Sequence, residues 1–364
     1  MDIIQRLGYI QIDTISVIER AHHHVFFTRQ PQYQTTNLDR LLADRQVFEY
    51  WAHAAAYLPM SDFRFSLLSK GEFSNGKRHW FEKDKKIMRH VLKRIKEEGP
   101  LQSRDFANPT DKRHPWYEWK PAKMALTELF MEGKLMVAGR QGFQKVFDLT
   151  ERVLPDGVDL TKPTKTEFCK YLIQRSVQAQ GVVASRDITY LRSGLQPTMD
   201  NVLKRMANLG ELIRVEVEGM DGQLYSFSEI LSQLKSTETN PEVHLLSPFD
   251  NLIIQRKRVK EFFGFDYQIE CYVPEKKRKY GYFCLPILYG ERFVGRFDPK
   301  ADRKTKTFYV QGLWYEPSFT PSDDFFAKFS KKILELARFC GCDEVRFDRK
   351  VPGNVLVQLK EFIH

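Results

Sequence analysis

Residues 120–149, KPAKMALTELFMEGKLMVAGRQGFQKVFDL, decide how this chain folds, because they predict a helix followed directly by a two-stranded hairpin. The helix stops at Gly133, since glycine readily ends a helix. Short apolar runs at 135–138 and 145–149 flank a glycine-containing turn at 139–142, so strand, turn and strand follow one another.

The residues before this stretch complete a three-helix unit. Apolar residues recur with helical spacing over 87–95, and a Gly-Pro pair at 99–100 ends that helix. Residues 101–106 then predict a turn into a short helix. Three helices and a two-stranded wing make a winged helix-turn-helix, which commonly docks on DNA and also serves as a scaffold or protein-binding module.

The same plan recurs in residues 166–228. Ser-Arg-Asp occurs at 103–105 and again at 185–187, each time where the short helix begins. The third helix of the second copy, 199–209, again ends at a glycine, and 212–227 predict a second wing. An internal repeat of this kind indicates tandem winged-helix units.

The two ends of the chain follow different plans. The N-terminal region is a partial winged-helix unit, with a helix at 37–42 and a wing at 47–58. From 241 onward we expect strands at 279–285, 292–297 and 307–313, a helix at 323–339 and a late strand at 344–347.

These patterns predict an α+β fold made of tandem winged helix-turn-helix units and a C-terminal β-rich domain. The predicted domains are 1–75 (a partial winged helix), 76–160 and 161–240 (two winged helices) and 241–364 (a β-rich domain with two helices).

The composition favours a nucleic-acid partner. Lys and Arg number 57 against 47 Asp and Glu, a formal net charge of +10 over 364 residues. The five cysteines are odd in number and form no Cys-x-x-Cys pair, so they indicate neither a disulfide framework nor a zinc site. No apolar run approaches the roughly 18 residues of a membrane helix, and no phosphate loop or dinucleotide fingerprint is present. We expect a cytoplasmic monomer without metal or cofactor.

Near the N-terminus, Ile10 and Ile12 alternate with Gln11 and Asp13, a period of two that predicts an extended segment. In that geometry Gln11 and Asp13 project from one face. An amide and a carboxylate side by side can hold and deprotonate a water molecule, or stabilise positive charge on a nearby atom. Alternatively, Asp13 caps a helix, because residues 16–19, SVIE, fit a capping box.

This pair and its surroundings resemble the AlkZ/AlkX-type (YcaQ-like) winged-helix DNA glycosylases, whose catalytic signature is Gln-Φ-Gln or, as here, Gln-Φ-Asp. The matching blocks lie at 11–15, 19–23, 48–54, 57–59, 247–253, 272–274, 280–282, 285–288, 294–296 and 298–303. The resemblance implies that a small C-terminal β-barrel braces the tandem winged helices. Family members usually have a further helix upstream of the signature, whereas Met1 lies only ten residues before Gln11.

The resemblance also implies a monofunctional, metal-independent DNA repair enzyme. It would act on double-stranded DNA that carries N7-alkylguanine or interstrand crosslinks, and would leave an abasic site. Asp13 would stabilise the sugar cation and activate water, and Gln11 would orient that water. The alternatives are a non-catalytic winged-helix DNA-binding regulator and a protein-interaction scaffold.

Other polar residues are weaker candidates. The three histidines at 22–24 cannot converge on one metal ion, because adjacent helical residues point in different directions, so packing and a polar contact are favoured. Tyr50, Trp51 and His53 either border a substrate pocket or form the core of the wing. Basic residues that would contact DNA phosphates, or else form a solvated face, are Lys112, Arg113, Arg140, Arg256, Arg258, Lys277, Arg278 and Lys279.

Overall fold

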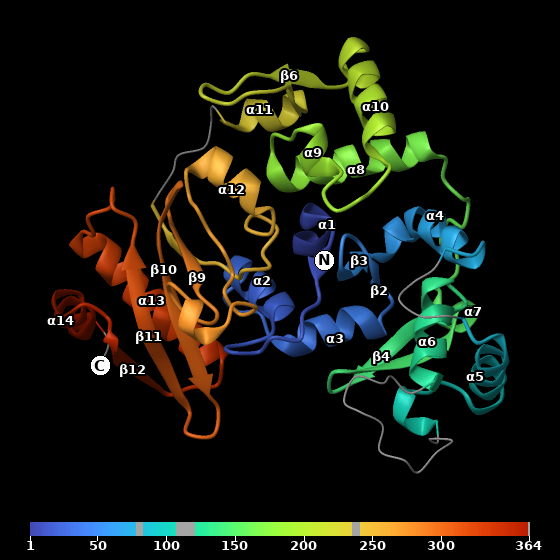
Figure 1. Cartoon of the computed structure of the whole chain (residues 1–364), viewed down its shortest axis with the longest axis horizontal. Helices are drawn as coiled ribbons and strands as arrows, with labels where there is room; N and C mark the ends of the chain where they lie inside the picture. Colours follow the sequence, from blue (N-terminus) through green and yellow to red (C-terminus); the bar gives the residue numbers. More distant parts are fainter. Residues whose placement is uncertain (78–82, 107–120, 235–240, 363–364) are drawn as a thin grey trace. The chain divides into compact units, whose positions relative to one another are not determined.

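A computed structural model describes residues 1–77, 83–106, 121–234 and 241–362 (Figure 1). The chain divides into two compact units: the first contains residues 1–9 and 35–172, and the second contains 10–34 and 173–364. The boundary at residue 172 falls inside helix α8 (Lys165–Gln180). Within the described ranges, no helix has both the length and the apolar character needed to cross a membrane.

The N-terminal part of the first unit has the helix and hairpin that the sequence predicts. Its elements are α1 (Asp2–Leu7), α3 (Thr35–Ala43), β2 (Val47–Trp51), β3 (Ala55–Pro59), η1 (Met60–Asp62) and α4 (Phe63–Ser74). β2 and β3 pair antiparallel along their whole length. The rings of Phe48 and Phe63 meet edge to face with centroids 5.2 Å apart, so the start of α4 packs on the hairpin.

A winged helix follows in the same unit, as predicted. It consists of α5 (Lys85–Glu98), η2 (Ser103–Asp105), α6 (Pro121–Met131), β4 (Leu135–Gln141) and β5 (Gln144–Leu149), after which comes α7 (Thr150–Val153). Leu101 and Phe147 exchange two backbone hydrogen bonds of 2.9 and 2.8 Å, which join the η2 turn to the wing.

The second winged helix repeats this arrangement. It consists of α8, α9 (Ser185–Ile188), α10 (Gln196–Asn208), β6 (Ile213–Val215) and β7 (Leu224–Ser226), and α11 (Ser228–Leu234) follows. Val183 bridges to Tyr225 as Leu101 does to Phe147. The recurring Ser-Arg-Asp also has a common role. The carboxylates of Asp105 and Asp187 accept the backbone N–H three residues earlier, at 2.7 and 2.9 Å, and so fix the start of each short helix.

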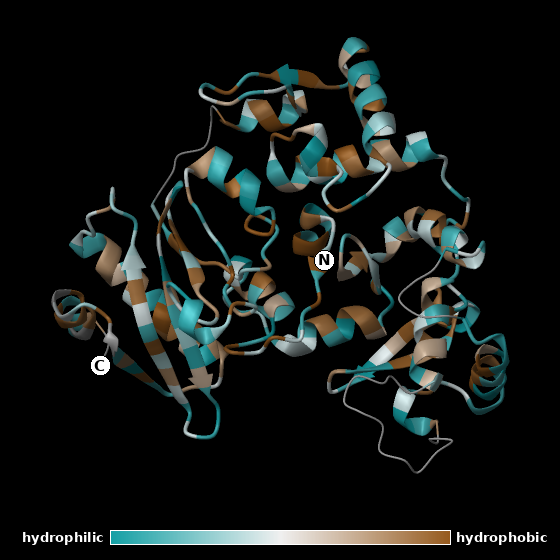
Figure 2. Ribbon diagram, viewed as in Figure 1, coloured by the Kyte–Doolittle hydropathy of each residue, from teal (hydrophilic) through white to brown (hydrophobic). Residues whose placement is uncertain are grey.

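The C-terminal part of the second unit is built on a five-stranded sheet of order β12-β11-β10-β9-β8. The strands are β8 (Val243–Leu245), β9 (Leu285–Tyr289), β10 (Arg292–Asp302), β11 (Thr307–Tyr315) and β12 (Glu344–Lys350), and the helical elements are α12 (Arg256–Phe263), η3 (Glu275–Lys277), α13 (Asp323–Phe339) and α14 (Gly353–Phe362). Bands of apolar and polar residues alternate along these strands (Figure 2), and in β10 residues 293–299 are buried on both faces of the sheet.

The expected β-barrel is wrong, because β8 and β12 form the two edges of this sheet and do not pair among the described residues. A barrel buries its apolar face by closing on itself, whereas here α13 covers that face. Phe329 of α13 meets Phe297 of β10 edge to face at 5.8 Å. Phe325 and Ile333 of the helix belong to the same buried cluster.

The strand predicted at 279–285 is also wrong, because β9 begins only at Leu285. The backbone N–H groups just before it donate to buried carboxylates instead of to a neighbouring strand. Glu270 accepts those of residues 279–281 at 2.8, 2.8 and 3.0 Å, and Asp298 accepts those of residues 282–283 at 3.3 and 3.1 Å. A Cβ on Gly281 would overlap the Asp298 carboxylate, so this approach requires glycine.

Candidate active site

Gln11 and Asp13 lie at the start of the second unit. Gln11 belongs to the two-residue strand β1 (Ile10–Gln11) and is 9% exposed, whereas Asp13 is half-buried. The alternative that Asp13 caps a helix is wrong, since residues 14–20 are not helical and α2 (Ala21–Arg29) begins only afterwards. Instead, Oδ1 of Asp13 accepts the backbone N–H of Ile15 at 2.8 Å, which fixes the carboxylate at the end of the extended segment.

The surroundings of Asp13 act on its carboxylate in opposite directions. Burial raises the pKa of Asp13, and hydrogen bonds from the backbone N–H groups of Ile15 and Thr14 oppose that rise. Within the part of the chain that the structure describes, no lysine or arginine forms an ion pair with Asp13. A half-buried carboxylate without a fixed counter-ion can stabilise a positive charge that develops beside it during a reaction.

Two residues far along the chain lie within the electrostatic reach of Asp13. Its negative charge adds to burial in raising the pKa of Cys271 and that of Tyr272. Sequence reasoning did not assign either residue to the site. The one available signal was that Tyr272 begins a block shared with the glycosylases, and nothing in that block indicates which residues it contacts.

Strand β10 anchors both the segment after Asp13 and the loop after Cys271. Ala301 donates its backbone N–H to the carbonyl of Val17 at 3.0 Å, and the Arg303 guanidinium donates to the carbonyl of Ile18. Three residues before Ala301, Asp298 accepts the N–H groups of residues 282–283. Three residues of strand span about 10 Å, so the segment after Asp13 and the loop that follows Cys271 are anchored close together.

The three histidines lie on α2 and make the contacts of a packed helix. Nδ1 of His23 lies 2.8 Å from the Tyr33 hydroxyl. His24 is buried, and burial lowers its pKa to about 4. In the described ranges, no three histidine, cysteine or acidic side chains gather as they would around a metal ion. The packing interpretation therefore explains these residues without a ligand.

Tyr50, Trp51 and His53 belong to the first unit, whereas Gln11 and Asp13 belong to the second. Tyr50 is buried in the wing, where its hydroxyl donates to the carbonyl of Met131 at 2.8 Å, so it has the core role that the sequence left open. Trp51 is 36% exposed on β2. His53 is half-buried and packs edge to face on Tyr9 at 5.2 Å.

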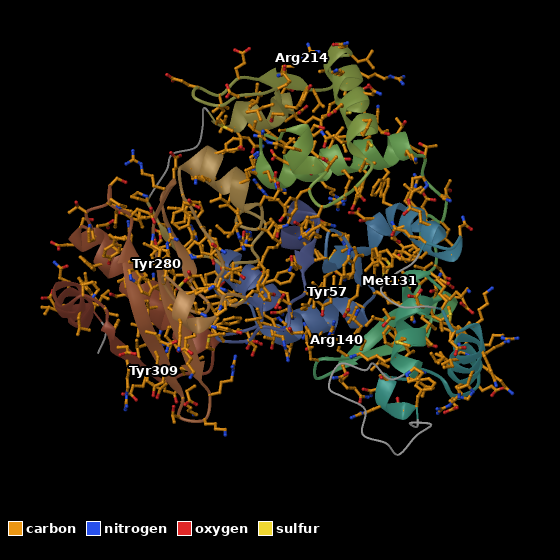
Figure 3. All side chains as sticks on the ribbon, viewed as in Figure 1. Tyr57, Met131, Arg140, Arg214, Tyr280 and Tyr309 are labelled. Carbon is orange, nitrogen blue, oxygen red and sulfur yellow. The ribbon has the colours of Figure 1, made fainter. Side chains whose placement is uncertain are left out.

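Several predicted DNA contacts have partners within the protein. Arg140, labelled in Figure 3, pairs with the buried carboxylate of Glu49 at 2.5 Å. Arg258 pairs with Asp187 at 2.8 Å, and Arg256 donates to the backbone carbonyls of residues 248 and 253. These contacts favour structural roles for the three arginines. Lys112 and Arg113 lie outside the described residues.

Lys277, Arg278 and Lys279 lie in one loop of the second unit. Lys277 and Lys279 are exposed, and Arg278 is half-buried. The Arg278 guanidinium lies 4.9 Å from the centre of the Tyr282 ring, and the Lys279 ammonium lies 4.9 Å from that of Tyr280. This loop therefore presents positive charge and aromatic rings together.

Comparison with known proteins agrees with this arrangement of elements. The structure is similar to that of the Streptomyces sahachiroi DNA glycosylase AlkZ, with a TM-score of 0.61 and 17% sequence identity over 95% of this chain and 92% of that one. Residues 4–339, and with them Gln11 and Asp13, match the family described as DNA glycosylase AlkZ-like. This chain belongs to the AlkZ-like DNA glycosylase family.

Proposed function

We propose that this glycosylase hydrolyses the N-glycosidic bond of N7-alkylguanine in double-stranded DNA and unhooks interstrand crosslinks made through that atom. Asp13 stabilises the sugar cation and activates the water that attacks it, and Gln11 orients that water. The observation that carries the proposal is the half-buried Asp13 carboxylate, which no lysine or arginine of the described residues neutralises.

The chemistry of the substrate explains why one carboxylate is sufficient. Ordinary glycoside hydrolysis needs a second carboxyl group, which protonates the leaving group. An N7-alkylated guanine is already cationic and leaves as a neutral base. At about 4 Å and an effective dielectric of about 20, a carboxylate attracts a unit positive charge by ~4 kcal/mol. If that attraction acts only in the transition state, it accelerates the reaction roughly a thousandfold.

The position of guanine N7 in the duplex favours crosslinked DNA as a substrate. Guanine N7 faces the major groove, so bulky adducts and crosslinks at this atom protrude from the helix. A base that is covalently joined to the other strand cannot be swung out in the ordinary way. The net charge of +10 supports binding to the duplex backbone. Most hydrogen bonds between proteins and DNA are made to this backbone.

The proposal is tested by incubating the protein with labelled duplexes that contain one N7-methylguanine or one nitrogen-mustard crosslink. A monofunctional enzyme gives strand breaks only after alkali treatment, and the crosslinked duplex separates into single strands on a denaturing gel. Duplex affinity is measured in parallel. If the protein binds these duplexes but produces no alkali-labile sites and leaves the crosslink intact, the proposal is refuted and the non-catalytic regulator is favoured.

A further inference from the structure

Residues 270–284, here named the tyrosine loop, present two tyrosine rings to solvent. Tyr272 is 74% exposed and Tyr282 is 39% exposed. The Arg278 guanidinium lies over the Tyr282 ring, and its Nε donates to the carbonyl of Val273 at 2.9 Å. Tyr280, labelled in Figure 3, marks the position of this loop on the second unit. An aromatic ring left this open can stack on a flat ligand.

The tyrosine loop is held in one conformation. As described above, five successive backbone N–H groups, those of residues 279–283, donate to the carboxylates of Glu270 and Asp298. Arg278 holds the middle of the loop through Val273. A ring on a preorganised loop loses little conformational entropy when a ligand stacks on it.

The tyrosine loop and the segment that follows Asp13 are anchored on the same strand. The segment that follows Asp13 and the end of the tyrosine loop are both hydrogen-bonded to β10, at Ala301 and Asp298. Ile15 and Ile269, which flank the two segments, pack against one buried cluster. The effect of the Asp13 charge on the pKa of Tyr272 agrees with this proximity.

We propose that the Tyr272 ring stacks on the damaged base and selects cationic purines, with Tyr282 beside it as a second stacking surface. The proposal rests on the proposed function, because it assigns the recognition of the alkylated base to a residue next to Asp13. The face of a tyrosine ring attracts a cation as well as stacking on a base. An N7-alkylguanine is a flat cation, so it is attracted to the ring and also stacks on it. Unmodified guanine is neutral, so it only stacks.

This role affects one kinetic constant more than the other. When the glycosidic bond breaks, the electron pair of that bond passes to the base, which becomes neutral, and the positive charge moves to the sugar. The attraction between the Tyr272 ring and the base is therefore strongest before bond cleavage. Loss of the ring raises KM and weakens binding, while kcat does not fall.

The test uses the full chain with Tyr272→Leu, which removes the ring, and Tyr272→Phe, which removes only the hydroxyl. Tyr309→Leu is the matched control, because Tyr309 lies on β11 of the same unit outside the tyrosine loop. Binding to duplexes with one N7-methylguanine or with unmodified guanine is measured by fluorescence anisotropy at several salt concentrations. Release of 7-methylguanine is measured on the same proteins.

Tyr272→Leu is expected to weaken binding to the N7-methylguanine duplex by roughly 5- to 150-fold, the range for loss of one stacked aromatic ring. Its affinity for the unmodified duplex falls by a smaller factor, because only stacking is lost there. Its salt dependence stays as in the wild type, since no phosphate contact is lost. Tyr272→Phe and Tyr309→Leu stay within about twofold of the wild type.

The inference is overturned if Tyr272→Leu keeps the wild-type preference for the methylated duplex, or if Tyr272→Phe is as defective as Tyr272→Leu. These failures are distinct from failure of the proposed function. A wild-type protein that selects the methylated duplex through Tyr272 but releases no base refutes only the reaction. Base release that requires Asp13, with a KM and a duplex affinity that Tyr272→Leu leaves unchanged, refutes only the stacking role.

Discussion

Lys70, on α4 of the first unit, provides a test of the electrostatic reasoning that is independent of catalysis. It is 5% exposed, and among the described residues its ammonium has no hydrogen-bond partner. The ammonium lies 3.6 Å from the centre of the Phe63 ring and 4.8 Å from that of Tyr50. Burial lowers the pKa of Lys70 from 10.5 to about 7. We expect Lys70→Met to stabilise the protein.

The size and the sign of this effect follow from linkage. Between the folded and unfolded pKa values of Lys70, the unfolded chain binds a proton that the folded protein does not, so stability rises with pH by about 1.4 kcal/mol per unit. At pH 8 the burial of Lys70 therefore lowers the free energy of unfolding of the wild type by up to about 3 kcal/mol, and Lys70→Met removes this loss. Attraction of the ammonium to the two rings reduces this value. The difference in unfolding free energy between Lys70→Met and the wild type disappears as the pH approaches the pKa of lysine in the unfolded chain, about 10.4.

Urea unfolding of the wild type and of Lys70→Met at pH 7, 8, 9 and 10 measures the difference directly. The matched control is Lys77→Met, because the Lys77 side chain is 52% exposed and should give no such trend. A stability difference that does not change with pH, or a Lys70→Met protein that is less stable than the wild type at pH 8, would contradict a destabilising burial of the Lys70 ammonium.

Three further predictions concern the buried pair of Arg140 and Glu49, the Asp13 carboxylate and the tyrosine loop. Arg140→Met should lower the unfolding free energy by about 3 kcal/mol, measured by urea titration, because it leaves the buried Glu49 carboxylate without its closest cation. The rate of base release should fall as the pH drops, with an inflection above the ordinary pKa of aspartate, because burial raises the pKa of Asp13 and its ionised form is the active one; a rate that does not change down to pH 4 would contradict this. Gly281→Ala should cost about 2 kcal/mol in the same titration, since it displaces a buried carboxylate from its N–H donors, whereas Gly139→Ala, where a Cβ has open space, should cost much less.

The helices and wings could be predicted because their signals are local. Glycines end the helices, and apolar spacing changes from the helical period to that of strands within a few residues. Helix α13 (Asp323–Phe339) was predicted with its observed bounds, and its first turn is fixed by the Ser322 hydroxyl, which accepts the N–H of Phe325. The residues of the first helical turn are therefore enough to predict where this helix begins.

The remaining features depend on partners far apart in the sequence. The charge of Arg140 does not reveal Glu49, which lies 91 residues away, so an ion pair and a phosphate contact look alike in the sequence. Residues 279–284 have the composition of a strand, but their N–H groups bond to Glu270 and Asp298. An open sheet and a barrel differ only in whether the edge strands meet, which strand content does not specify. For the same reason, the sequence could not show that Tyr272 lies within the electrostatic reach of Asp13.

The most direct test of the central claim is the single-turnover rate of 7-methylguanine release from a duplex by the wild type and by Asp13→Asn. We expect a loss of roughly a thousandfold in Asp13→Asn, with unchanged affinity for the duplex. Asp44→Asn, at an exposed position after α3, should react at the wild-type rate. Release by Asp13→Asn at the wild-type rate would contradict the claim that this carboxylate carries the reaction.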